Sequence, residues 1–291
     1  MTLQETLEAT RQKVEAALAA TLDAVSPEAR EHLGGEAFQA ALCHAVQGGG
    51  KRVRPTLTLL CAQACGVADG SPEAEDALHG AVAIELLHNY TLVHDDLPCM
   101  DNDTERRGAP SVWAKFGEGD AVLAGDYLQA LAFAQLCPCR RAGEMLPLLT
   151  LAATQVIHGQ VSDIAAAKVP PTEWLPSLLG YVFLNKTARL ISVACGLGAI
   201  AAGAQPEVCA ALMDYGTNVG LAFQYIDDLL DARQSQSGNE LNAITLYAGS
   251  KGAVHTSAEY CTAQALKALD KVPGDTATLA AFAASLLDRL T

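Results

Sequence analysis

The segment EDALHGAVAIELLHNYTLVHDD, residues 75–96, decides the fold class. It is long and mostly apolar, which predicts a buried helix rather than a strand. Similar helical patterns run along most of the chain, over about residues 4–24, 55–65, 118–136, 142–167, 172–203, 206–232, 250–270 and 275–290. Clusters of Gly, Pro and Ser separate these patterns, and no run shows the strict alternation of a strand. We expect an all-α bundle of about ten helices that forms one domain over residues 1–291.

The composition narrows the classes of function. Half of the 291 residues are hydrophobic, and 19 Lys and Arg against 33 Asp and Glu give a net charge of −14. So acidic a chain is a poor candidate for a general binder of nucleic acids or anionic membranes, because both reward an excess of Lys and Arg. The most apolar stretch, residues 190–204, falls short of the roughly 20 residues of a membrane span. We therefore expect a buried helix there, no transmembrane segment and no nucleic-acid partner.

The N-terminus and the cysteines indicate a cytoplasmic protein. The opening segment MTLQETLEATRQKVEAAL lacks the apolar core of a signal peptide. The nine cysteines include no CxxC pair and no zinc-binding spacing with histidine. We expect reduced thiols, most of them buried, in a cytoplasmic chain.

Two apolar helical segments each end in a cluster of aspartates, VHDDLPCMD at residues 93–101 and FQYIDDLLD at residues 223–231. A solvated acidic surface is the alternative to a functional site, since runs of charge are usually exposed. Both clusters, however, end strongly apolar helices, which favours a buried role for them. Carboxylate oxygens gathered in one place are typical ligands of Mg²⁺, which shares its coordination shell with water and substrate phosphates. The clusters therefore predict a magnesium site.

The spacing inside each cluster supports this interpretation. Asp227 and Asp231 lie one helical turn apart on one face, where two carboxylates repel each other unless a cation lies between them. In the first cluster, the ring of Pro98 is expected to end or kink the helix. The chain can then turn Asp101 back toward Asp95.

Two basic segments complement the carboxylates. GGGKRVRP at residues 48–55 places three cations directly after a run of glycines, whose backbone N–H groups are free to bind phosphate. It is not a Walker A motif, because the pattern GxxxxGK[ST] is absent. The second segment is Arg106-Arg107-Gly108, just past the first aspartate cluster. Carboxylate-bound Mg²⁺, basic side chains and apolar walls together suit a substrate with a diphosphate at one end and a hydrocarbon at the other.

These motifs resemble those of the trans-prenyltransferase family of isoprenyl diphosphate synthases, and most closely its bacterial short-chain farnesyl/geranyl diphosphate synthases. The resemblance covers about residues 40–232 and rests on GGGKRVRP, HDDLPCMD with RRG, KT at 186–187 and GLAFQYIDDLLD, in this order. It implies a helical bundle around a central cavity, a homodimer, and three Mg²⁺ ions bound with the substrate diphosphate. The implied reaction is head-to-tail condensation of isopentenyl diphosphate with an allylic diphosphate, dimethylallyl or geranyl, mainly to farnesyl diphosphate.

The resemblance also assigns roles to individual residues. The residues implied to bind Mg²⁺ are Asp95, Asp96, Asp101, Asp227, Asp228 and Asp231, with Asp228 also near the substrate. The allylic diphosphate is assigned to Arg106 and Lys186, and isopentenyl diphosphate to Lys51, Arg54, His88 and Arg107. Thr187 and Gln224 are placed near the reacting carbons. The departed diphosphate removes the final proton in this family, so His94 and His158 are expected to be structural.

Product length is expected to depend on Tyr90 and Thr91, five and four residues before Asp95. The family's growing chain runs along this helix toward its N-terminus, and one turn advances roughly 5 Å. A tyrosine there predicts a floor that stops the product at C15, with C10 as the alternative. The alternative is that Tyr90 is an ordinary core residue.

One departure from the family pattern opens alternatives. The family carries two lysines soon after the second aspartate cluster, whereas residues 232–250 contain none, Ala243 stands where one is expected, and Arg233 is the only cation before Lys251. Removing a contact to the leaving group can slow turnover on the order of 10²–10³-fold. A geranyl or geranylgeranyl diphosphate synthase, a slow enzyme, a partner-activated subunit and a non-catalytic binding paralogue therefore stay open. A terpene cyclase is disfavoured, because the second motif is DDxxD and GGGKRVRP offers a second diphosphate site.

Overall fold

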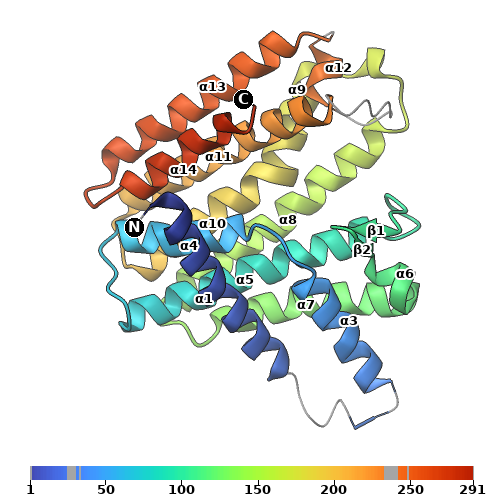
Figure 1. Cartoon of the computed structure of the whole chain (residues 1–291), viewed down its shortest axis with the longest axis horizontal. Coiled ribbons are helices and arrows are strands. Elements are labelled where there is room, and N and C mark those ends of the chain that lie inside the picture. Colours follow the sequence, from blue (N-terminus) through green and yellow to red (C-terminus); the bar gives the residue numbers. More distant parts are fainter. Residues whose placement is uncertain (1, 25–30, 33, 233–241, 248, 291) are drawn as a thin grey trace.

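The computed structural model describes residues 2–24, 31–32, 34–232, 242–247 and 249–290, and helices dominate it (Figure 1). The α-helices are α1 (Leu3–Asp23), α3 (Gly35–Gln47), α4 (Val53–Ala64), α5 (Pro72–Asp95), α6 (Val112–Phe116), α7 (Glu118–Leu136), α8 (Ala142–Ala166), α9 (Pro176–Val182), α10 (Arg189–Ala201), α11 (Pro206–Asp231), α12 (Ala243–Leu246), α13 (Lys251–Ala268) and α14 (Ala277–Asp288). The other helical turns are η1 (Pro171–Glu173), η2 (Phe183–Ala188) and η3 (Leu269–Lys271). The strands are β1 (Glu105–Arg106) and β2 (Ala109–Pro110), which form an antiparallel hairpin. The prediction of an all-α fold is confirmed.

The predicted helix bounds agree closely with the structure where the sequence carries a start signal. Ser71 caps α5 with its side-chain oxygen, and Pro72 occupies the first turn, where a missing N–H costs nothing. Two expectations were wrong in detail. Pro55 does not open its helix, which begins two residues earlier at Val53. The stretch over residues 172–203 is three consecutive helical pieces rather than one regular helix. Helices α3 and α6 fall outside the predicted ranges.

Helix α10 lies at the centre of the bundle. Nearly all of its residues are buried, and it packs against α4, α5, α8 and α11. Leu190 and Leu197 belong to the hydrophobic cluster shared with α5, α7 and α8, whereas Ile191 and Cys195 belong to the cluster shared with α11, α13 and α14. One helix therefore joins the two hydrophobic clusters that hold the aspartate-bearing helices.

We expected no apolar stretch long enough to span a membrane. Judged by length and composition alone, that expectation was wrong. The helical run Ser177–Ala201 is apolar enough over 25 residues to cross a membrane. However, 61% of its apolar window is buried inside the bundle, which is typical of the core helix of a globular protein. The burial of α10 agrees with the prediction for this region.

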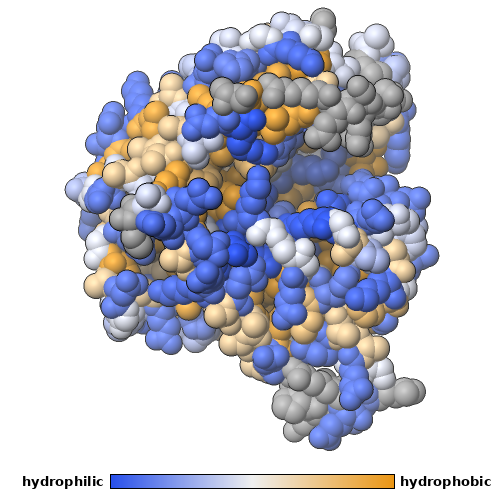
Figure 2. Space-filling view, viewed as in Figure 1, coloured by the Kyte–Doolittle hydropathy of each residue, from blue (hydrophilic) through white to orange (hydrophobic). Residues whose placement is uncertain are grey.

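The arrangement of helices positions the site. In Figure 1, α11, α13 and α14 lie together on one side of α10, and α3, α5 and α7 lie together on the other. The surface is hollowed between α12 and the β1–β2 hairpin, and hydrophilic side chains surround this hollow (Figure 2). The C-terminal ends of α5 and α11, which carry the two aspartate clusters, are therefore contributed by opposite sides of the bundle.

Candidate active site

The first aspartate cluster forms where α5 ends. Asp95 is the last residue of α5, and the backbone N–H of Asp101 donates to the Asp95 carbonyl over 2.9 Å. Asn102 follows in a left-handed conformation, with φ 57°. Because Pro98 cannot continue a helix, the chain closes a tight loop there and returns Asp101 to Asp95. The predicted return of Asp101 is confirmed.

Asp95 and Asp101 lie close to a lysine from another element. Burial raises the pKa of Asp95 to about 7, with Lys186 lowering it and Asp101 raising it further. Burial also raises the pKa of Asp101, against the opposing charge of Lys186. The Lys186 ammonium donates to Asp163 Oδ2 over 2.5 Å. Three carboxylates thus surround one cation, and two of them hold protons more tightly than a solvated aspartate does.

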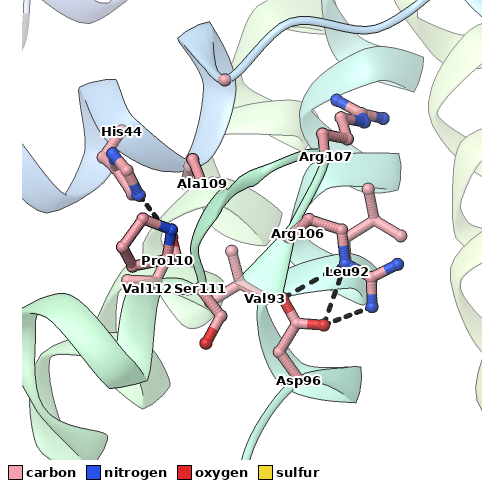
Figure 3. A pocket seen from close by; sticks show the side chains of 12 residues that line it. His44, Leu92, Val93, Asp96, Arg106, Arg107, Ala109, Pro110, Ser111 and Val112 are labelled. Atoms are coloured by element: carbon pink, nitrogen blue, oxygen red, sulfur yellow. Dashed lines mark hydrogen bonds and ion pairs between the residues drawn. The ribbon is translucent and has the colours of Figure 1, made fainter. Parts of the chain in front are cut away.

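Asp96 serves a different partner. It is 2% exposed, and the Arg106 guanidinium donates to it through Nε over 3.0 Å and through Nη2. Figure 3 shows Arg106 turned toward Asp96, with Arg107 pointing away from it. The pocket behind this pair has a volume of about 40 Å³, which is room for water rather than for a substrate. Asp96 therefore anchors the hairpin in this structure, and its role as a metal ligand stays a prediction.

The two-residue turn of the hairpin separates the two arginines. Arg107 and Gly108 both have positive φ, 56° and 78°, as a type I′ turn requires. The Arg107 guanidinium donates to the carbonyl of Gly49 in the glycine run. A Cβ on Gly50 would lie 2.8 Å from Arg107 Nη1, so the glycine run allows Arg107 to approach the backbone.

The basic segment divides into a structural arginine and residues that face the site. Arg52 is 2% exposed and pairs with Glu15 and Glu85 at 2.8 and 2.7 Å. Arg54 Nη1 lies 3.1 Å from His88 Nε2, and Lys51 is exposed.

His88 and Arg54 form a pair with one charge. Burial and the charge of Arg54 hold the pKa of His88 well below its usual range, so His88 is neutral and accepts from Arg54. Burial lowers the pKa of Arg54 to about 10, which leaves it charged at neutral pH. This pair and Arg107, which the resemblance assigns to isopentenyl diphosphate, thus lie near one another.

A π-helical turn, η2, presents Lys186 and Thr187. Such turns interrupt α-helices most often at functional sites. Gly159 on α8 makes room for it, since a Cβ there would lie 2.6 Å from the backbone N of Lys186. Burial opposes the charge of Lys186, but Asp163, Asp95 and Asp101 outweigh it and raise the pKa of Lys186.

Thr187, Gln224 and Asp228 form a chain of hydrogen bonds. The Thr187 hydroxyl donates to Gln224 Oε1 over 2.8 Å, and Gln224 Nε2 donates to Asp228 Oδ1 over 2.9 Å. The backbone N–H of Ala243 donates to Asp228 Oδ2 over 2.6 Å. Burial nevertheless raises the pKa of Asp228 to about 6. Asp228 therefore ties η2, α11 and α12 together, and its expected metal role is untested.

Asp227 pairs with an arginine near the C-terminus. Arg289 Nη2 donates to Asp227 Oδ1 over 2.8 Å, and the guanidinium lies 5.0 Å from the centre of the Phe223 ring. Burial raises the pKa of Asp227, and Arg289 and Lys51 oppose the rise while Asp231 adds to it. Asp231 itself is exposed at the end of α11.

The donor set fits Mg²⁺ bound together with a diphosphate. The carboxylates of the two clusters offer oxygen ligands, and burial raises their pKa values, so a bound cation would favour their charged form. Gln160, one turn before Asp163 on α8, is 8% exposed, and within the described residues its amide has no hydrogen-bond partner. Among the same residues, no three Asp, Glu, His or Cys side chains could hold a metal by themselves. Mg²⁺ takes one or two carboxylates from a protein and completes its shell with water and phosphate.

Sequence reasoning missed three residues of the site: Gln160, Asp163 and Arg289. The first two stand three residues apart on one face of an apolar helix, a spacing that could have indicated them. Nothing local marks Arg289, because its partner lies 62 residues away.

The remaining predicted residues lie on α5. His94 is structural as predicted, with Nε2 3.0 Å from the Val122 carbonyl, whereas His158 lies exposed on α8. Tyr90 is 7% exposed, with its ring edge-on to His94, and the Thr91 hydroxyl donates to the carbonyl of the preceding turn.

The segment that lacks the family lysines is described in part. Arg233 lies outside the described residues. Lys251 donates to the carbonyl of Ala232 over 3.3 Å, at the end of α11. Ala243 contributes its backbone N–H to Asp228, as stated above. The described part of this segment therefore stabilises the end of α11.

Comparison with known proteins agrees with this geometry. The family model described as polyprenyl synthetase matches residues 35–245. Geranylgeranyl pyrophosphate synthase 12 of Arabidopsis thaliana is 39% identical over 208 residues, which are 68% of this chain and 56% of the plant protein. The short chain isoprenyl diphosphate synthase of Methanocaldococcus jannaschii is also 39% identical, over 65% of this chain and 55% of the archaeal protein. The chain thus spans little more than half the length of these curated relatives.

Solved structures share the fold over almost the whole chain. An FPP/GFPP synthase from Zymomonas mobilis superposes with a TM-score of 0.84 at 30% identity, covering 98% of both chains. A geranyltranstransferase from Thermotoga maritima superposes with a TM-score of 0.80 at 26% identity, covering 97% of both chains. The motif order, the fold and the family match agree, and this chain belongs to the polyprenyl synthetase family.

Proposed function

We propose that this chain is a short-chain trans-isoprenyl diphosphate synthase, which condenses isopentenyl diphosphate with dimethylallyl or geranyl diphosphate. The observation that carries the proposal is that one partly buried carboxylate of each aspartate cluster lies near its own basic side chain. Asp95 lies near Lys186, and Asp227 is bonded to Arg289, with Lys51 and Arg54 also near it. A helical protein without a diphosphate ligand has no need of this costly arrangement.

The residues divide the work as follows. Mg²⁺ held by Asp95, Asp101 and Asp227 would stabilise negative charge on the departing diphosphate. Lys186 donates hydrogen bonds to the allylic diphosphate and so favours cleavage of its C–O bond. Arg54 and Arg107 bind the diphosphate of the second substrate. Neutral His88 orients Arg54 without adding charge.

The hydrocarbon must be shielded while the bond is broken. Apolar walls exclude water from the allylic cation, which water would otherwise quench. The Thr187–Gln224 pair joins η2 to α11, and its oxygens can face developing positive charge without acting as a nucleophile. No covalent protein intermediate is needed, and the released diphosphate takes the final proton.

Farnesyl diphosphate is the product that the chain length argument favours. Tyr90 is a large buried side chain on α5, about one turn before Asp95, and its ring packs edge-on against His94. A buried aromatic ring at this position supports a floor for a growing chain. The names of the relatives, which include geranylgeranyl and FPP/GFPP synthases, keep geranylgeranyl diphosphate as the alternative product.

We further propose a homodimer in the cytoplasm. Several apolar side chains on α7 and α8 are exposed: Val122, Leu123, Leu151, Ile157 and Val161. An exposed apolar surface of this kind favours burial against a second copy. All nine cysteines are free, with Cys99 and Cys137 exposed, which suits a reducing compartment.

The test is product analysis. Purified protein is incubated with Mg²⁺, labelled isopentenyl diphosphate and either allylic primer, and the dephosphorylated alcohols are separated by length. We expect a C15 product, which lengthens in Tyr90→Ala and keeps its length in Tyr260→Ala, a control at an exposed tyrosine on α13. A C20 product from the unaltered chain would overturn the floor argument. Substrate binding without any product would favour the non-catalytic paralogue.

A further inference from the structure

Arg289 is fixed by two residues of α11. It follows the last residue of α14, and its Nη2 donates to Asp227 Oδ1 over 2.8 Å. The same guanidinium lies over the Phe223 ring, one turn before Asp227, at 5.0 Å. Its Nη1 is buried and has no hydrogen-bond partner within the described residues. Two contacts on one helix thus hold the cation against an oxygen of the second aspartate cluster.

The contact places Arg289 in competition with a metal ion. Asp231 and Lys51 are the other charged groups that act on Asp227 there. A guanidinium 2.8 Å from Oδ1 takes up a lone pair of that oxygen, and its charge would repel a divalent cation bound to the same carboxylate.

We infer that Arg289 is the resident counter-ion of Asp227, and that loading of the metal must displace it and loosen the end of α14. This inference rests on the proposed function, because the metal would enter together with a diphosphate. Within the described residues, no cation donates a hydrogen bond to the Asp95 carboxylate. Lys186 lies near Asp95, but its hydrogen bond goes to Asp163. The second cluster should therefore load after the first.

The test measures metal affinity without turnover. Mn²⁺ is titrated into the full chain and free Mn²⁺ is followed by electron paramagnetic resonance, with and without inorganic pyrophosphate. Arg289→Gln should bind Mn²⁺ about tenfold more tightly than the unaltered chain, as expected for removal of one charge-assisted hydrogen bond. Arg289→Lys keeps the charge and should stay near the unaltered affinity. Arg140→Gln is the matched control, since Arg140 pairs with Glu73 and Asp76 at the opposite end of α5.

A second measurement needs no variant. Hydrogen exchange of the peptide that covers residues 281–290 should become faster when Mn²⁺ and pyrophosphate are added. Slower exchange there, or an affinity in Arg289→Gln that is unchanged or weaker, would overturn the inference and leave the proposed function intact. Absence of Mn²⁺ binding to the unaltered chain, even with pyrophosphate, would overturn both.

Discussion

Each aspartate cluster contains two consecutive aspartates, and the two members of each pair differ in burial and in bonding partners in the same way. In each pair the first carboxylate, Asp95 or Asp227, is partly exposed and coupled to cations from other elements. The second, Asp96 or Asp228, is buried and bonded to a segment that follows in sequence. Asp96 holds the β1–β2 hairpin through Arg106, and Asp228 holds α12 through the Ala243 backbone. In each consecutive pair the second carboxylate is an anchor, and the first is left for the proposed binding of metal.

The clusters differ in how their first carboxylate is neutralised. Lys186 acts on Asp95 from the π-helical turn and has a second carboxylate, Asp163, of its own. Asp227 depends on Arg289, which comes from the far end of the chain and donates to it directly. The first cluster is thus built to keep its carboxylate available, whereas the second keeps its carboxylate occupied until something replaces the arginine.

The largest predicted effect is on kcat/KM, which should fall much further for a carboxylate that faces the substrate than for one that does not. Asp95→Ala should lower kcat/KM by about 10³, because it removes charge that stabilises the transition state. Asp231→Ala should cost only about tenfold, since Asp231 is exposed and less confined. Steady-state kinetics with geranyl diphosphate measure both values, and circular dichroism checks the fold. Equal losses in the two variants would contradict the difference drawn between them.

Asp96 and Asp228, the anchoring carboxylates, should matter more for stability than for catalysis. We expect Asp228 to contribute more stability than Asp96. Asp228→Ala leaves two buried N–H donors without an acceptor, so we expect it to lower the free energy of unfolding by about 2–3 kcal/mol. Asp96→Ala leaves Arg106, whose side chain is 35% exposed and keeps Asp103, so the loss should be about 1 kcal/mol. Urea denaturation of both variants measures the difference. A larger loss for Asp96→Ala would reverse the assignment of the stronger anchor.

The sequence allowed prediction of what local chemistry determines. The long, mostly apolar run over 75–96 predicted α5, and Pro98 predicted the loop that returns Asp101 to Asp95. The division of labour within each aspartate pair could not be read from adjacent identical residues, because it depends on which oxygen meets Arg106 or Ala243. Arg289 was missed for the same reason. A tertiary contact across 62 residues leaves no periodic signal, and the position of Arg289 directly after an apolar C-terminal helix gives no hint of a site.

The smallest predicted effect is on the pH dependence of stability. It tests whether the charged form of buried Asp95 lowers the free energy of unfolding. Burial raises the pKa of Asp95 to about 7, whereas an unfolded aspartate titrates near pH 3.9. Between these values the unfolded chain has already lost the proton that the folded chain keeps, so ionisation favours unfolding and stability falls as pH rises from about 4 to about 7.

Asp95→Asn removes this penalty. In metal-free buffer the variant should be about 1–2 kcal/mol more stable than the unaltered chain at pH 8, after allowance for partial solvation, and equal to it at pH 4. Asp270→Asn, at an exposed aspartate on η3, should change neither value. Urea titrations at the two pH values measure the difference. If Asp95→Asn were the less stable protein at pH 8, Lys186 would be stabilising Asp95 more than burial destabilises it, and the first cluster would resemble the second in holding its own resident counter-ion.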